Sequence, residues 1–117
     1  MRFEWIDTIE DKTIVLGYLT IADGVYTWEY SNIRHEYPHF NEVSFRLPGL
    51  PFDQKTTSDT LFDFFKNRIP PQTPARKENW RKMLDKYALS EYNELDWLIA
   101  SRLRLSIDTY ELVKVGD

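Results

Sequence analysis

Thr57 to Pro71 read T-S-D-T-L-F-D-F-F-K-N-R-I-P-P, and this stretch decides how the rest of the chain is organised. Thr57 or Ser58 can cap the start of a helix, and Asp59 would add a carboxylate to its first turn, where the helix dipole favours negative charge. The two prolines cannot continue a helix and push the residue before them out of helical geometry. The pattern predicts a short helix that stops at Ile69.

The expected helix is strongly amphipathic. At about 100° per residue, one arc holds the apolar residues Leu61, Phe62, Phe64, Phe65 and Ile69. Phenylalanines this closely spaced need a surface to pack on, so we expect Phe62, Phe64 and Phe65 to lie in the core against a sheet. Arg68 falls on the edge of the apolar arc and does not fit this core pattern.

The composition is that of one folded domain. The chain has 117 residues, 42% hydrophobic and 15% aromatic, and no cysteine. A chain of this length buries roughly two-thirds of its unfolded surface and folds without disulfides. The absence of cysteine excludes thiolate zinc sites and thiol catalysis. No apolar run reaches about 18 residues, and charges at Arg2 and Glu4 do not suit a signal peptide, so we expect a cytoplasmic protein without a membrane anchor.

The net charge of −4 hides a basic segment. Between residues 66 and 86 seven basic residues face two acidic ones, a net charge of +5, whereas the remainder carries −9. Such a segment could meet nucleic acid or an acidic protein surface. The alternative is a solvated helix face on which Glu78 and Lys82 form an i,i+4 pair.

The N-terminal part predicts a β-hairpin. Residues 13–21 are rich in β-branched side chains, Ala22-Asp23-Gly24 suits a tight turn, and residues 25–30 resume with strand formers. Tyr26, Trp28 and Tyr30 share one face of the second strand, and we expect this aromatic face, with Trp28, to point into the core.

One string resembles a zinc motif. His35-Glu36-Tyr37-Pro38-His39 matches H-E-x-x-H, in which two histidines one helical turn apart bind zinc. Pro38 would break the turn that must bring the two imidazoles together, and the chain has no third histidine. We expect no metal site here.

The remaining pattern completes an α+β fold. Residues 42–47 alternate like a third strand, and Thr109–Val115 predict a final strand. Thr73, with Pro74 at the first position, predicts a second helix whose core face includes Trp80, and Ser90 predicts the start of a third. We expect a small antiparallel sheet of three to five strands packed with about three helices in a single domain, residues 1–117.

The third helix leaves one tryptophan unexplained. Its apolar stripe comprises Tyr92, Leu95, Leu98 and Ile99. Trp97 lies nearly opposite Leu95, so it packs on a second layer or is partly exposed.

The sequence offers little for catalysis. It has no Gly-rich phosphate loop, no G-x-S-x-G and no cysteine nucleophile. Asp59 and Asp63 are spaced to hold a hard cation, but capping and solvent-facing roles explain them better. We expect no enzyme activity and no cofactor.

The order of these pieces resembles the small N-terminal subdomain of HipA-type serine/threonine kinases. In that family a strand ending in Leu-Pro, here Leu47-Pro48, precedes a helix of the form x-F-x-F-F-x-N-x-x-P. The matching residues here are Phe62, Phe64, Phe65, Asn67 and Pro70, and the closing Asp108-Thr109-Tyr110-Glu111-Leu112 is also similar. Arg102-Leu103 stand where many members have Gly-Gly. The resemblance covers roughly residues 13 to 115.

The resemblance implies that HipA-type kinases carry their catalytic residues in a further, longer portion, which we expect this protein to lack. A free-standing copy resembles the HipS-like antitoxins of tripartite HipBST systems, which implies binding and neutralisation of a HipA/HipT-like kinase, with a HipB-like helix-turn-helix protein in the same complex. Arg68, Trp97 and Asn67 are the candidate partner-binding residues. The alternative is a nucleic-acid-binding module that uses residues 66–86.

Overall fold

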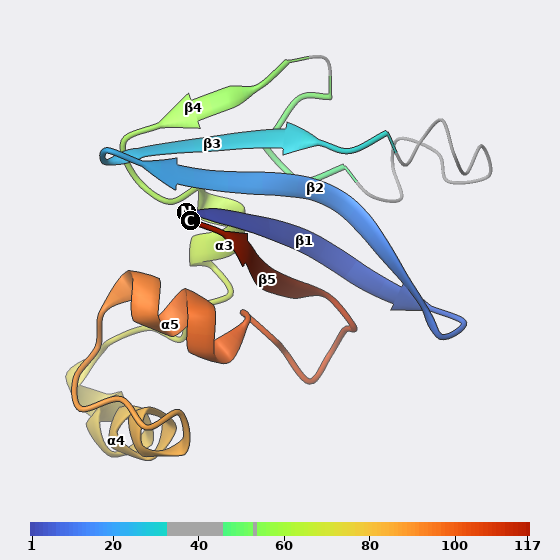
Figure 1. The fold of residues 1–117 in the computed structure, drawn as a ribbon. Coiled ribbons are helices and arrows are strands. Elements are labelled where there is room, and N and C mark those ends of the chain that lie inside the picture. Colours follow the sequence, from blue (N-terminus) through green and yellow to red (C-terminus); the bar gives the residue numbers. More distant parts are fainter. Residues whose placement is uncertain (33–45, 53) are drawn as a thin grey trace.

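The computed structural model describes residues 1–32, 46–52 and 54–117 (Figure 1). Within these ranges five strands form one antiparallel sheet in the order β4-β3-β2-β1-β5. The strands are β1 (Arg2–Ile9), β2 (Lys12–Ala22), β3 (Val25–Tyr30), β4 (Thr56–Ser58) and β5 (Glu111–Gly116). The helices are α3 (Asp63–Lys66), α4 (Lys77–Lys86, preceded by the 3-10 turn η1, Pro74–Arg76) and α5 (Glu94–Ser101). The expected α+β class, strand number and helix number are therefore confirmed.

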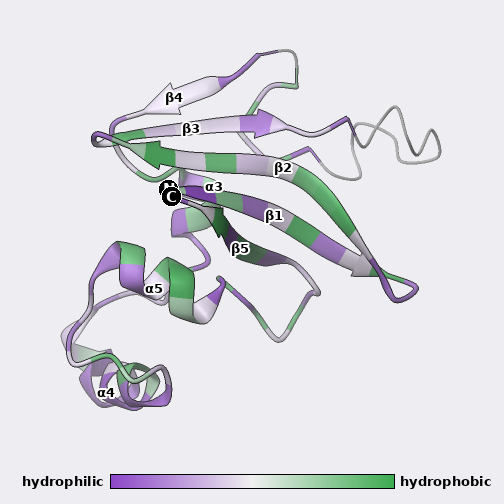
Figure 2. Ribbon diagram, in the orientation of Figure 1, coloured by the Kyte–Doolittle hydropathy of each residue, from purple (hydrophilic) through white to green (hydrophobic). Residues whose placement is uncertain are grey.

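One face of the sheet carries the core. Phe3 pairs with Leu19, Leu19 with Trp28, and Trp5 with Leu112, and these five side chains are completely buried. Directly opposed residues of neighbouring strands point to the same face, so these cross-strand pairs form one continuous apolar surface. Hydrophobic and hydrophilic residues alternate along β1 in Figure 2, as a half-buried strand requires.

Gly17 makes room for the Trp28 indole on this surface. A Cβ atom at Gly17 would lie 2.4 Å from two carbons of the Trp28 indole and 2.7 Å from the Glu29 carbonyl oxygen. Both distances are far below van der Waals contact, so the close approach of the indole to β2 requires glycine at this position.

The hairpin turns have the backbone that two-residue loops need. Asp23 and Gly24 both have positive φ, 51° and 75°, which is the geometry of a type I′ turn. The β2–β3 hairpin predicted from residues 13–30 is thus confirmed. The β1–β2 turn uses Glu10 and Asp11, also at positive φ.

The helices cover one face of the sheet in two layers. Figure 1 shows α3 next to the sheet, and α5 between the sheet and α4. In Figure 2, α4 is largely hydrophilic. α5 therefore packs against the sheet on one side and against α4 on the other. A helix in this position buries side chains on two sides, not along a single apolar stripe.

The helix expected from Thr57 to Ile69 is wrong in its extent. Thr57 and Ser58 pair with β3 as the edge strand β4, and α3 has a single turn that begins after Phe62. Strand pairing with β3 takes the place of helix capping, and Asp59 lies outside the helix.

The packing role of the phenylalanines is confirmed. Phe65 is fully buried, with its ring centroid 5.3 Å from that of Trp5 and 5.4 Å from that of Trp28. Phe62 and Phe64 are partly buried against the same core.

Two expectations concern other segments. The last strand is confirmed as β5, two residues shorter at its start than predicted. The H-E-x-x-H string and residues 42–45 of the expected third strand lie outside the described residues, and Arg46 and Leu47, which are described, are not in a strand. No described helix is long and apolar enough to cross a bilayer.

Candidate partner-binding site

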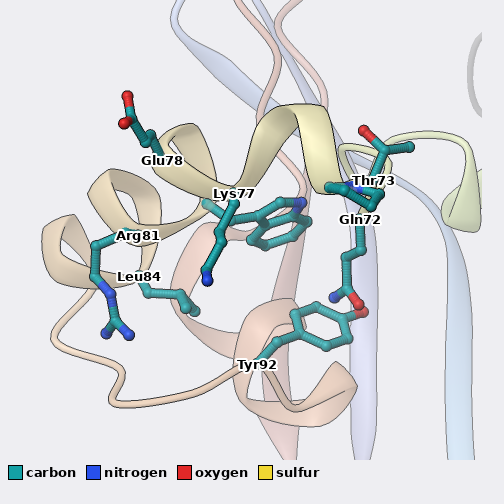
Figure 3. A pocket seen from close by; sticks show the side chains of 9 residues that line it. Gln72, Thr73, Lys77, Glu78, Arg81, Leu84 and Tyr92 are labelled. Carbon is teal, nitrogen blue, oxygen red and sulfur yellow. The ribbon is translucent and has the colours of Figure 1, made fainter.

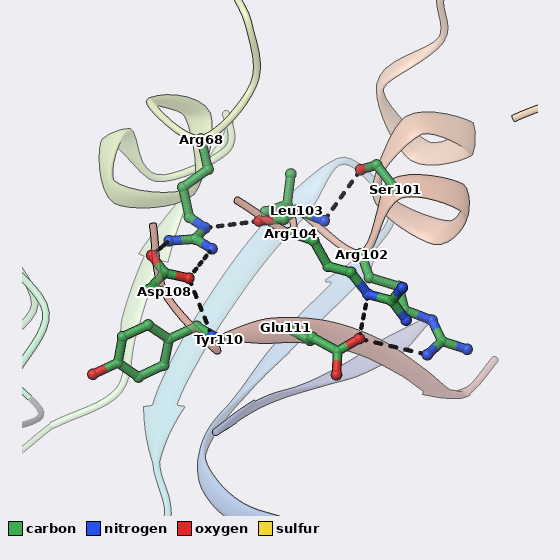
Figure 4. A network of polar contacts seen from close by, with 8 residues as sticks. All are labelled: Arg68, Ser101, Arg102, Leu103, Arg104, Asp108, Tyr110 and Glu111. Carbon is green, nitrogen blue, oxygen red and sulfur yellow. Dashed lines mark hydrogen bonds and ion pairs between the residues drawn. The ribbon is translucent and has the colours of Figure 1, made fainter. Parts of the chain in front are cut away.

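Arg68 is an internal cross-link rather than a surface group (Figure 4). Its guanidinium donates two hydrogen bonds to Asp108, from Nη1 to Oδ2 at 2.8 Å and from Nη2 to Oδ1 at 2.9 Å. Nε donates to the Leu103 carbonyl oxygen at 2.9 Å, and Cζ lies 4.8 Å from the Trp5 ring centroid. Arg68 is 9% exposed, so it cannot serve as an exposed anchor as expected. Arg68 lies at the edge of the apolar arc because its charged group pairs with Asp108, 40 residues later in the sequence.

The carboxylate partner is held in its charged form. The hydrogen bonds from Arg68 lower the pKa of Asp108, and the Tyr110 backbone N–H, which donates to Oδ1, acts in the same direction. Burial of Asp108 opposes them. A forked Arg–carboxylate pair of this kind fixes both partners in one geometry.

The loop that supplies these contacts has an unusual backbone. Arg102 and Leu103 follow α5 with φ of 54° and 50°, in the left-handed region that glycine adopts most easily. Ser101 fixes the turn, because its Oγ donates to the Trp97 carbonyl oxygen at 2.7 Å and accepts from the Leu103 N–H at 3.1 Å. The Leu103 side chain is 1% exposed and returns to the core.

Trp97 also lies inside the molecule. It is 3% exposed and belongs to an aromatic cluster in which its ring centroid is 5.0 Å from Trp80, 5.2 Å from Tyr87 and 6.3 Å from Tyr92. The sequence left open whether Trp97 packs on a second layer or is partly exposed. It packs on a second layer, because α5 lies between the sheet and α4. Ile99, expected on the buried stripe, is 38% exposed instead.

Trp80 is core, as predicted. It is 7% exposed, and its indole N–H donates to the Pro71 carbonyl oxygen at 2.9 Å. This bond ties α4 to the double proline that follows α3. Ala88, just after α4, is exposed and has a positive φ of 58°.

An open groove of about 840 Å³ lies beside this cluster (Figure 3). Its apolar lining comes from Pro74, Trp80 and Leu84 on η1 and α4, and from Tyr92 ahead of α5. Its charged lining residues are Lys77, Arg81 and Glu78. A concave apolar surface of this size with charged groups at its edge is typical of a ligand- or peptide-binding site.

A second hollow of about 510 Å³ continues from the groove, sharing Gln72 and Tyr92 with it. Asn67 lines this hollow and is exposed, so of the three candidate residues it alone is accessible. Glu94 at its edge accepts a 2.6 Å hydrogen bond from the Tyr26 hydroxyl. Burial, followed by this hydrogen bond, raises the pKa of Tyr26 to about 12.

The basic segment is mostly exposed once Arg68 is removed from it. Six basic residues between 66 and 86 remain at the surface: Lys66, Arg76, Lys77, Arg81, Lys82 and Lys86. The ion pairs among described residues involve none of these six, and the expected Glu78–Lys82 pair does not form. The segment therefore carries net positive charge, and two of its exposed cations, Lys77 and Arg81, line the groove.

Sequence reasoning missed the groove because it assigned Tyr92 to a helix. Asn93 is the N-cap of α5, with its Oδ1 accepting from the Asp96 N–H at 3.1 Å, so Tyr92 precedes the helix and reaches toward α4. The signal was present, since Asn is a strong N-cap and Glu94 and Asp96 fill the first turn. Ser90 was the weaker choice of start.

Clusters of three metal-ligating side chains are absent from the described ranges. Comparisons with models of protein families, with curated proteins and with solved structures find no match to this chain.

Proposed function

We propose that this protein is a non-catalytic regulatory subunit that binds and neutralises a HipA/HipT-like serine/threonine kinase, in the manner of a HipS-like antitoxin. The observation that carries the proposal is the Arg68–Asp108 fork. It joins the two segments on which the resemblance rests, residues 58–70 and 108–112, into one unit.

The backbone after α5 gives further support. Many members of the HipA family have Gly-Gly where this chain has Arg102-Leu103, and both residues adopt the left-handed conformation that glycine favours. The departure from the family pattern therefore falls at two positions whose backbone glycine would adopt easily.

The nucleic-acid alternative has weaker support. Arg68 is paired internally, so it is lost from the basic surface. Backbone binding to nucleic acid requires several cations along one path and would show a steep dependence of affinity on salt.

The test is neutralisation of a kinase encoded beside this protein. We expect co-expression to restore growth of cells that the kinase arrests, and the purified proteins to form a stable complex by size-exclusion chromatography and calorimetry. A serine/threonine kinase of another family is the control and should not bind. Absence of both complex and growth rescue would rule out the antitoxin role.

The same preparation can include a HipB-like helix-turn-helix protein. We expect this chain to enter a complex with the helix-turn-helix protein only when the kinase is also present. The reason is that the kinase, not the helix-turn-helix protein or DNA, is the proposed binding partner of this chain.

A further inference from the structure

The groove combines two segments that only the folded chain brings together. On α4, residues 77, 80, 81 and 84 repeat at the three- and four-residue spacing that puts side chains on one side of a helix. Tyr92 faces them across the groove (Figure 3). Trp80 and Leu84 are 7% and 8% exposed, so they form a floor.

The rim of the groove has unbalanced charge. Lys77 and Arg81 are one helical turn apart, and no ion pair within the described part of the chain involves either of them. Glu78 also lines the groove, although in Figure 3 its carboxylate points away from the side on which the Lys77 and Arg81 groups lie, so the lining has two cations and one carboxylate. Like charges at this spacing repel each other, and a bound carboxylate would relieve the repulsion.

We propose that this groove is the docking site for an acidic segment of the partner kinase, with one apolar side chain as its anchor. The anchor lies against the apolar floor and Tyr92, and flanking carboxylates pair with Lys77 and Arg81. The identity of the partner rests on the proposed function; the chemistry of the segment rests on the groove. Buried anchors surrounded by a polar rim supply most of the binding energy in protein interfaces.

A nucleic acid fits the same surface less well. Single strands bind by stacking bases on exposed aromatic faces. The Trp80 ring is already packed edge-on against Tyr92 and Trp97, with centroids 5.3 and 5.0 Å away.

The decisive variants reverse charge on two sides of one helix. K77E/R81E changes the groove rim. K82E/K86E makes the same change in net charge on the opposite side of α4, about 140–180° around the helix. All four side chains are exposed, so both proteins should fold like the parent, and melting curves check this.

The first measurement is calorimetric titration with the neighbouring kinase. K77E/R81E should bind about tenfold more weakly or worse, with K82E/K86E within about threefold of the parent. If K77E/R81E binds like the parent, or if both variants lose affinity equally, the groove is not the docking site although the kinase-binding function stands.

The second measurement does not require the kinase. A short acetylated peptide with one tryptophan between two pairs of glutamates is titrated into labelled protein and followed by two-dimensional NMR. We expect shifts at the Trp80 indole N–H and at amides of residues 77–84 and 92, and their loss in K77E/R81E. A matched peptide with glutamines tests the charges.

The two measurements separate the two proposals. If the kinase does not bind but the peptide shifts the groove residues, the proposed function fails and the acidic-segment site stands. If the peptide leaves the groove unshifted at millimolar concentration, the site is overturned. A single-stranded oligonucleotide that shifts the same residues more tightly than the peptide also overturns it, in favour of nucleic acid.

Discussion

The Arg68–Asp108 fork gives the sharpest test of the fold. Replacing Arg68 with Ala leaves the partly buried Asp108 carboxylate without its main partner and removes the contact of the guanidinium with Trp5. Breaking a buried pair in this way costs about 3–5 kcal/mol. The Asp108 side chain is 21% exposed and keeps the Tyr110 N–H, so we expect the lower end, about 3 kcal/mol.

The measurement is urea and thermal unfolding. A domain of this size is stable by about 5–15 kcal/mol, so R68A should remain folded with a melting temperature lower by roughly 10 °C or more. R104A is the matched control, because Arg104 also pairs with a carboxylate, that of Glu111, but is 58% exposed. R104A should lower the free energy of unfolding by less than about 1 kcal/mol. If R68A is no less stable than R104A, the fork does not hold these segments together.

Acid unfolding provides an independent check on the same pair. The pKa of Asp108 is lowered below its ordinary value of 3.8 in the folded protein. A lowered pKa contributes stability that is present above 3.8 and is lost as the pH falls through the folded-state pKa. The stability difference between the parent and D108N should therefore be constant near neutral pH and shrink in acid. A difference that does not change with pH would argue against a charged pair.

Three further predictions concern packing and one hydrogen bond. Gly17→Ala should destabilise the protein by more than about 2 kcal/mol in urea unfolding, because the new methyl group would clash with the Trp28 indole on the neighbouring strand. Gly116→Ala is the control: its new Cβ atom would have no contact closer than 3.9 Å, so the stability should not change. Trp80→Ala should lose roughly 3–5 kcal/mol in urea unfolding through the cavity it leaves. Glu94→Gln should move the pKa of Tyr26 from about 12 toward 10, measured by alkaline ultraviolet titration; an unchanged value would show that burial alone raises it.

Local sequence signals predicted the hairpin and the final strand well. The β2–β3 turn followed from Asp23-Gly24, which fits a two-residue loop without knowledge of the rest of the chain. The helix predicted at Thr57 failed because its first residues pair with β3, and pairing between distant segments overrides a local capping preference.

The candidate site was harder to predict for a related reason. A helical wheel assumes one buried side, but α5 is covered on two sides, so Trp97 looked misplaced when it was core. Arg68 looked like a surface anchor because its partner, Asp108, belongs to another segment. The basic and aromatic residues of α4 were recognised individually, but the groove needs Tyr92 from the connection to α5.

The position of α4 beyond α5 has a consequence for hydrogen exchange. This layer is attached through the aromatic cluster around Trp97, so α4 can open without exposing the apolar face of the sheet. Its amides should exchange through a partial unfolding of lower free energy than the global transition that exposes β1 and β2. A molecule that fills the groove would contact both α4 and Tyr92, so it would have to dissociate or lose one of these contacts before α4 could move away. Slowed exchange confined to α4 would therefore report an occupied groove even when the ligand is unknown.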